Sequence, residues 1–366
     1  MLHVTNHHYQ GGMSERTVRD MRIARITSAA LGAACALSAC HPGPRDSSRT
    51  TMPNSAASIT SFPSATPAPW PAPADSSLTK VPVLDSFMTV RQLGSGSPIV
   101  FLHGNPLSSQ VWHQVLPPLS AKHRCLAPDL IGMGDSGKPD IAYRLGDHVR
   151  YLDAWFEAMG LESAVLIGYD WGGVLAMDWA ARHPNRVRGL VVFETFLRPM
   201  TWSEWSPRGA ELFKGLRTPG VGEKMVLESN QFLDRSLANG IERPLAEAER
   251  AVYYAPYSEP ASRRPILQWT REIPIEGAPA DVEAVFARYG AWLAASPAVP
   301  KLLLSFDAPE GLQPSPTGAP GMIDWARSHV SALEVKHVGT AAHHAPEDLP
   351  EPIAGTIASW LARSGL

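Results

Sequence analysis

The sequence predicts an α/β fold in which helices cover both faces of a mainly parallel central sheet and a helical cap is inserted late in the chain. From Val81 onward, short apolar runs alternate with longer amphipathic runs, a rhythm typical of parallel strands connected by helices. Between Phe196 and about Pro297 this rhythm stops. The interruption indicates a helical insertion between two strands, placed as a lid where open α/β sheets bind ligands.

Individual elements follow from the same pattern. The continuous apolar run at 98–104 is typical of a central strand covered on both faces. One helix is expected over 147–160, closed by Gly160, and another over 173–184, stopped by Pro184. The other expected strands are 87–93, 125–130, 163–170, 187–195 and 301–306.

Length and composition set the class of protein. The chain has 366 residues, of which 44% are hydrophobic and 18% charged, a composition of globular proteins with one or two domains. The formal net charge is −3, and no run of like charges is present that would indicate a nucleic-acid partner.

The first forty residues read as an export segment. A short basic stretch, 21–25, precedes the uncharged run 26–39, which is too short for a membrane span of ~20 residues and fits the apolar region of a secretory signal. The run ends in Leu-Ser-Ala-Cys, which resembles the lipobox of bacterial lipoproteins and marks Cys40 for lipidation.

We therefore expect a periplasmic or cell-envelope lipoprotein attached to a membrane through Cys40. The alternatives are a secreted protein with an ordinary cleaved signal, or an uncleaved segment. Translation starts at Met1 or Met21.

A second segment, 41–79, is rich in Pro, Ser, Thr and Ala and has no helical or strand periodicity, so we expect a disordered tether. The remaining chain divides into a first core part at 80–195, the cap at 196–297 and a second core part at 298–366. Of three cysteines, only Cys125 lies in this body, so no disulfide framework is expected.

The motif at 166–173, LIGYDWGG, has the glycine frame of a nucleophile elbow, the G-x-S-x-G turn of α/β-hydrolases, but carries Asp170 where serine is usual. An aspartate is ionised at neutral pH and can attack a carbon atom without a base. The resulting ester must then be hydrolysed by an activated water. That step requires a histidine.

Two adjacent histidines, His343 and His344, follow a strand-like segment near the C-terminus. We favour His343 as the base and assign His344 to the wall or to a supporting position. The acid that orients the base is expected to be Glu194, at the end of a strand, with Asp307 as the alternative at the end of another.

The loop after the central strand supplies hydrogen-bond donors. His103 and Gly104 open a loop whose backbone N–H groups can stabilise an oxyanion, and Asn105 adds a side-chain amide. Trp171, directly after Asp170, adds an indole N–H. Two neutral donors suit a departing halide anion, whereas an epoxide oxygen needs a proton.

These residues and several longer stretches resemble the haloalkane dehalogenases, within the α/β-hydrolase superfamily, from Val81 to the C-terminus. The subfamily that the chain resembles has an Asp-His-Glu triad and an Asn-Trp halide pair. The matching stretches are 101–112, 123–140, 170–173, 193–205, 213–225, 272–282 and 292–304.

The resemblance implies hydrolysis of small halogenated aliphatic substrates to an alcohol and halide, with water as co-substrate and with no metal or organic cofactor. It implies that Asp170 is the nucleophile, that His343 and Glu194 complete the triad, and that Asn105 and Trp171 bind halide. It also places three residues in the substrate pocket, Phe213, Leu216 and Phe232.

Two other functions stay open at this point. Many epoxide hydrolases also have Asp followed by Trp at the elbow, and three cap tyrosines could donate the proton: Tyr253, Tyr254 and Tyr257. The second open function is a non-enzymatic receptor or display module on a lipid anchor. A complete triad argues against it.

Overall fold

The computed structural model describes residues 77–312 and 315–366. The predictions for the export segment, for Cys40 and for most of the tether lie outside these residues. Residues 77–79, predicted as the end of the tether, form instead the start of the first strand, which spans Ser77–Val83. Within the described ranges no helix is both long and apolar enough to cross a membrane.

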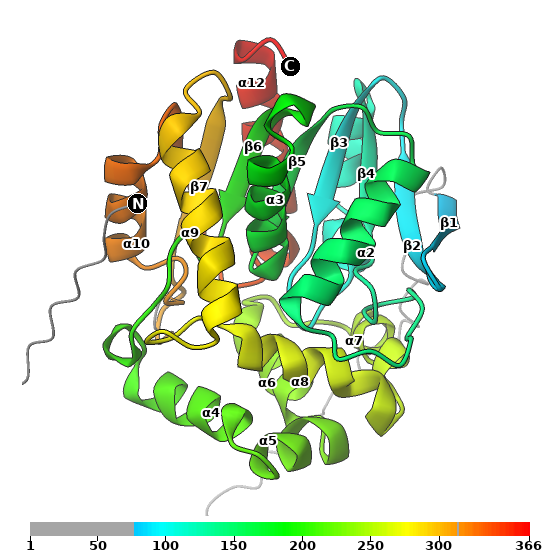
Figure 1. Cartoon of the computed structure of the whole chain (residues 1–366), viewed down its shortest axis with the longest axis vertical. Helices are drawn as coiled ribbons and strands as arrows, with labels where there is room; N and C mark the ends of the chain where they lie inside the picture. The colour runs from blue at the N-terminus through cyan, green and yellow to red at the C-terminus, as the bar shows by residue number, and fades with distance from the viewer. Residues whose placement is uncertain (1–76, 313–314) are drawn as a thin grey trace, which may run out of the picture. The chain divides into compact units, whose positions relative to one another are not determined.

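The described residues form one sheet of eight strands in the order β1-β2-β4-β3-β5-β6-β7-β8 (Figure 1). The pairs from β4 through β8 are parallel, whereas β2 is antiparallel to both β1 and β4. The predicted mainly parallel sheet is thus confirmed. The strands are β1 (Ser77–Val83), β2 (Ser86–Leu93), β3 (Ser97–Leu102), β4 (His123–Pro128), β5 (Ala164–Tyr169), β6 (Val187–Phe193), β7 (Lys301–Asp307) and β8 (Leu333–Thr340).

Strand burial follows the sequence pattern. Every residue of β5 is buried, as are the last four of β3, because central strands covered on both faces need apolar side chains in both directions. In contrast, β8 at the sheet's edge has only half-buried and exposed residues. The apolar runs in the sequence therefore correspond to the buried central strands of the sheet.

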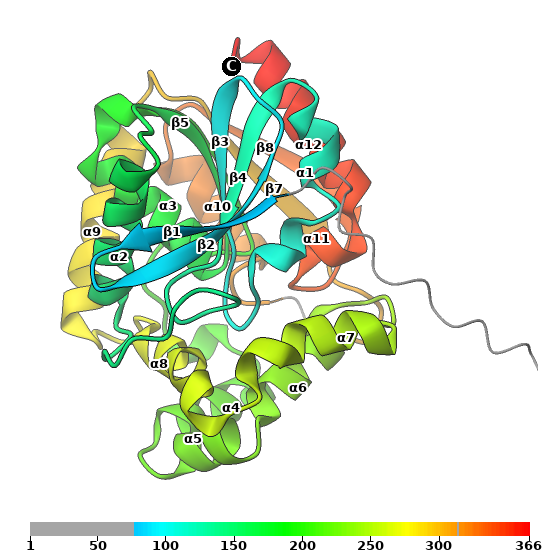
Figure 2. The same ribbon diagram turned by 90° about the vertical axis from the view of Figure 1, so that its right-hand side faces the viewer.

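Helices pack on both faces of the sheet (Figure 2). One face is covered by α2, α3 and α9, and the other by α1 and α12. The helices of these layers are α1 (Leu116–Ser120), α2 (Leu145–Ala158), α3 (Trp171–Arg182), α9 (Ala280–Ala295), α10 (Pro320–His329), α11 (Ala345–Asp348) and α12 (Pro350–Arg363).

Between β6 and β7 the chain forms a helical cap at the end of the sheet (Figure 1). Its main helices are α4 (Pro207–Arg217), α5 (Val221–Glu223), α6 (Gln231–Gly240), α7 (Glu247–Tyr254) and α8 (Arg264–Glu272), with a π-helical turn at Lys224–Glu228.

The cap ends earlier in the chain than the predicted 196–297. Helix α9 lies against α3 in the core layer, where Arg288 of α9 pairs with the buried Asp178 of α3. The Tyr289 hydroxyl also donates to the Phe196 carbonyl oxygen at 2.6 Å. No strand lies between the cap helices and α9, so the sequence pattern does not mark where the cap ends and the core resumes.

Candidate active site

Asp170 occupies a sharp turn between β5 and α3. Its backbone has φ of +49°, a region that a residue with a side chain adopts only when the surrounding structure holds it there. The turn also requires Gly172, because an added Cβ atom there would lie 2.0 Å from the carbonyl oxygen of Leu102. The carboxylate thus projects from the carboxyl edge of the sheet at the start of α3, where the helix dipole favours a negative charge.

The structure brings the three residues of the predicted triad together. His343 lies in the loop between β8 and α11, and its Nδ1 atom is 3.0 Å from Oε2 of Glu194, which follows β6. Its Nε2 atom is 3.6 Å from Oδ2 of Asp170. The imidazole therefore stands between two carboxylates that come from the ends of neighbouring strands.

Two opposing effects set the pKa of His343. Burial favours the neutral ring and lowers the pKa, but the interactions with Asp170 and Glu194 favour the charged ring. The carboxylates outweigh burial and raise the pKa to about 10. With this raised pKa, His343 is an imidazolium at neutral pH.

Glu194 is held by the segment that precedes α10. The Thr317 hydroxyl donates to Glu194 Oε2 at 3.4 Å. The backbone of Gly318 approaches so closely that an added Cβ atom would lie 1.7 Å from Oε1. Sequence reasoning missed both residues, because their proximity to Glu194 arises only from the folded loop.

The alternative acid is not part of this group. Asp307 ends β7 with an exposed side chain, and its Oδ2 atom lies 3.4 Å from Nε2 of His337, which is also exposed. It has no contact with His343 among the interactions of the described residues.

Asn105 and Trp171, the predicted halide pair, both line the cavity beside Asp170. The Asn105 backbone N–H donates to Oδ1 of Asp170 at 2.7 Å, and its side-chain Nδ2 donates to the carbonyl oxygen of Ile266 at 3.2 Å. An amide nitrogen carries two hydrogens, so one remains for a ligand. The indole of Trp171 stacks on Trp269 with ring centroids 4.5 Å apart, which fixes its orientation.

The loop that carries Asn105 is held by His103. Its Nδ1 atom lies 2.9 Å from the Gly104 carbonyl oxygen, and its Nε2 atom accepts the Leu130 backbone N–H at 3.0 Å. This pattern requires the neutral ring with its proton on Nδ1, and burial lowers the pKa of His103. His103 therefore acts as a support for the donor loop.

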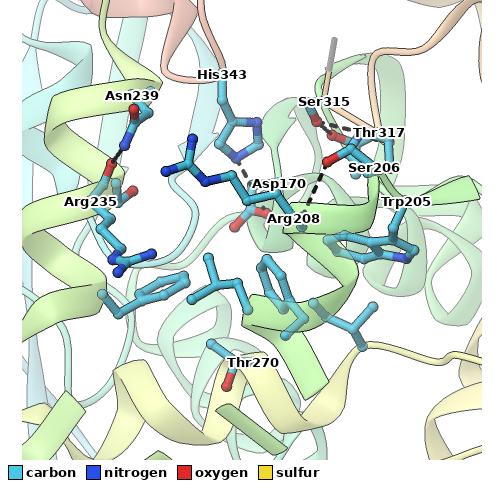
Figure 3. A pocket seen from close by; sticks show the side chains of 18 of the residues that line it. Asp170, Trp205, Ser206, Arg208, Arg235, Asn239, Thr270, Ser315, Thr317 and His343 are labelled. Atoms are coloured by element: carbon cyan, nitrogen blue, oxygen red, sulfur yellow. Dashed lines mark hydrogen bonds and ion pairs between the residues drawn. The ribbon is translucent and has the colours of Figure 1, made fainter. Parts of the chain in front are cut away.

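Above these residues lies a cavity of about 770 Å³ (Figure 3). Phe213 and Phe232 line it, as predicted from the resemblance. Leu216 does not: it is fully buried in the hydrophobic core on the inner side of α4, so its placement in the pocket is corrected. The lining also includes Arg208, Arg235, Asn239, Ser206 and Thr317, polar residues that no motif singled out.

His344 is not among the residues that line the cavity and is fully buried. Its Nε2 atom lies 2.7 Å from the Ser236 hydroxyl of α6, and its Nδ1 atom lies 3.2 Å from the Tyr169 hydroxyl. Its backbone N–H donates to the Gly240 carbonyl oxygen at 2.7 Å. Burial lowers the pKa of His344 well below its usual value. The neutral ring connects the loop that carries His343 to the cap.

None of the three cap tyrosines is among the residues that line the cavity. Tyr253 donates to Glu347, Tyr254 to Asp234, and the Tyr257 oxygen accepts the Gly134 backbone N–H. Their hydroxyl groups are thus engaged elsewhere, which does not favour epoxide opening.

Among the described residues, no group of three or more His, Cys, Asp or Glu side chains is placed to hold a metal ion. Cys125 is a buried free thiol on β4, and burial raises its pKa to about 12. It lies outside the cavity.

Comparison with known proteins places this site in context. A family model described as alpha/beta hydrolase fold matches residues 97–240. A haloalkane dehalogenase of Mesorhizobium japonicum is 43% identical over 300 residues, which cover 80% of this chain and 94% of the relative. Another, from Bradyrhizobium diazoefficiens, is 43% identical over 310 residues, with 79% and 96% covered.

Solved structures agree with the sequence comparison. A putative ancestral haloalkane dehalogenase matches with a TM-score of 0.74 and 45% identity, covering 79% of this chain and 99% of that one. The haloalkane dehalogenase from Bradyrhizobium elkani matches with a TM-score of 0.75 and 42% identity, with 80% and 99% covered.

Proposed function

Because the chain belongs to the haloalkane dehalogenase family, we propose that it hydrolyses the carbon–halogen bond of small aliphatic halides through a covalent ester on Asp170. The products are an alcohol, a halide ion and a proton. One observation supports the assignment of residues: the Asp170 carboxylate lies 3.6 Å from His343 Nε2 and shares one cavity with the uncharged donors Asn105 and Trp171.

In the first step, Asp170 displaces the halide from an sp³ carbon. Its Oδ1 atom is held by the Asn105 backbone N–H, which leaves Oδ2 to form the new carbon–oxygen bond. The carbon–halogen electron pair leaves with the halide. The free hydrogen of Asn105 Nδ2 and the indole N–H of Trp171 stabilise the anion without transferring a proton.

In the second step, the loss of the Asp170 charge lowers the pKa of His343. The Asp170 carboxylate, which raised this pKa in the free enzyme, has become a neutral ester, so the ring can release its Nε2 proton to solvent. The neutral imidazole then takes a proton from water, and the oxygen of that water attacks the ester carbonyl carbon. The Asn105 backbone N–H stabilises the oxyanion, and Glu194 stabilises the imidazolium.

The activity is tested by halide release from short bromoalkanes with purified protein. Wild type is expected to release bromide, and Asp170→Asn to release none beyond the uncatalysed rate. Opening of styrene oxide without bromide release would support epoxide hydrolysis instead.

We further propose that the protein is exported and attached to a membrane through lipidated Cys40. The sequence alone supports this: a basic start, an uncharged run and Leu-Ser-Ala-Cys before the tether. Palmitate labelling of the expressed full chain tests it. Label is expected in wild type and absent in Cys40→Ser; label that persists in the variant removes the proposal.

A further inference from the structure

Two arginines of the cap line the cavity. Arg208 extends from α4 and Arg235 from α6, and Figure 3 shows both among the lining side chains. Neither guanidinium group has a hydrogen-bond or ion-pair partner among the described residues. Other cap arginines are paired: Arg243 binds Glu249 and Glu347, and Arg271 binds Glu223.

The cavity does not supply a carboxylate for them. Asp170 is the one acidic residue in the lining, and it faces His343. Asp234, next to Arg235 in sequence, instead accepts the Tyr254 hydroxyl. The cavity wall on the cap side therefore carries two positive charges that are not neutralised within the described residues.

Apolar side chains make up much of the remaining wall. They include Phe196, Trp205, Leu212, Phe213, Phe232 and Ile273. Such a wall binds methylene chains, and a volume of about 770 Å³ lies in the range that holds ligands of moderate size. The lining thus combines a reactive carboxylate, an apolar wall and two cationic groups.

We propose that the preferred substrates are anionic: aliphatic chains with halogen at one end and a carboxylate at the other. This inference rests on the proposed dehalogenation. The halogenated carbon reaches Asp170, the chain contacts the apolar wall, and the carboxylate pairs with Arg208 and Arg235, whose planar forks match it. The arginines take no part in bond changes, and the products are a hydroxycarboxylate, a halide ion and a proton.

The expected effect is moderate because both arginines are exposed to solvent. Pairs of this kind each contribute little, and together they favour the anionic substrate by roughly two- to thirtyfold in kcat/KM. The preference arises mainly in KM, since the contact is present before and after the chemical step.

The experiment measures bromide release from 6-bromohexanoate and from neutral 6-bromohexanamide, with the longer 10-bromodecanoate and its amide as a second pair. The readout is the ratio of kcat/KM for acid to amide within each protein. In wild type we expect a ratio above one in at least one pair, decreasing as ionic strength rises.

The double variant Arg208→Gln with Arg235→Gln is expected to bring that ratio near one, and the double Lys variant to retain part of it. Arg250→Gln removes an exposed cap charge outside the lining and serves as the matched control with an unchanged ratio.

A wild-type ratio of one or less in both pairs would overturn the inference, as would a ratio that survives in the Gln double variant. In either case amide turnover shows that dehalogenation itself is intact. Absence of bromide release from acid and amide alike would overturn the proposed function, and this inference with it.

Discussion

The His343 ring lies between two carboxylates, with Nδ1 3.0 Å from Glu194 Oε2 and Nε2 3.6 Å from Asp170 Oδ2. Glu194 keeps its charge throughout the proposed cycle, whereas Asp170 loses its charge when the ester forms. His343 can therefore be a cation stabilised by two carboxylates in the free enzyme and a base in the ester intermediate. The predictions below test this arrangement and the loops that hold it.

The raised pKa of His343 makes stability depend on pH. The folded-state pKa is about 10, above the unfolded value of ~6.5. The contribution to stability is therefore complete below about pH 6.5 and is lost as pH rises to about 10. Its size is on the order of a few kcal/mol. Denaturant unfolding across this range should show a decline in wild type that is much smaller in His343→Gln. Equal declines in both proteins would contradict the raised pKa.

Glu194→Gln should slow ester hydrolysis more than ester formation, because the amide cannot stabilise the imidazolium that forms in the second step. We expect turnover to fall on the order of a hundredfold or more, with the alkylated enzyme visible by mass spectrometry after acid quenching. Asp307→Asn is the matched control and should keep normal turnover, since Asp307 is exposed and pairs with His337. The reverse pattern would assign the acid to Asp307.

Gly318→Ala should impair the triad although it replaces no charged residue. The added methyl would stand 1.7 Å from Glu194 Oε1, so the carboxylate must shift from Nδ1 of His343. We expect turnover to fall with accumulation of the ester. Gly321→Ala is the control, because an added Cβ atom there meets nothing within 4 Å. Equal turnover in the two variants would show that the loop does not position Glu194.

His344→Ala should loosen the contact between the cap and the loop that carries His343. It leaves the Tyr169 and Ser236 hydroxyl groups without their partner, at a cost of about 1–3 kcal/mol for a buried polar group, in addition to the cavity it leaves. Urea unfolding of His344→Ala, Ser236→Ala and the double variant measures the coupling between the two. Strictly additive effects would mean that the hydrogen bond contributes nothing.

The fold, and the turn that holds Asp170, could be predicted because their signals are local. A glycine frame around Asp170 after an apolar run specifies a turn with little reference to the rest of the chain. The other features depend on tertiary packing. Whether Leu216 faces the cavity or the core, and which loop reaches Glu194, is decided by how the cap helices and the segment before α10 pack. No motif distinguishes Arg208 and Arg235 from the other charged residues in the sequence, and only the folded structure brings both to one cavity.

The central claim is that Asp170 forms a covalent ester whose carbonyl carbon is attacked by water. The most direct measurement follows ¹⁸O during multiple turnovers of a bromoalkane in H₂¹⁸O, with mass spectrometry of the peptide that contains Asp170. We predict ¹⁸O in the Asp170 side chain, and unlabelled oxygen in the alcohol of the first turnover. Labelled alcohol from the first turnover, with an unlabelled Asp170, would show that water attacks the substrate directly.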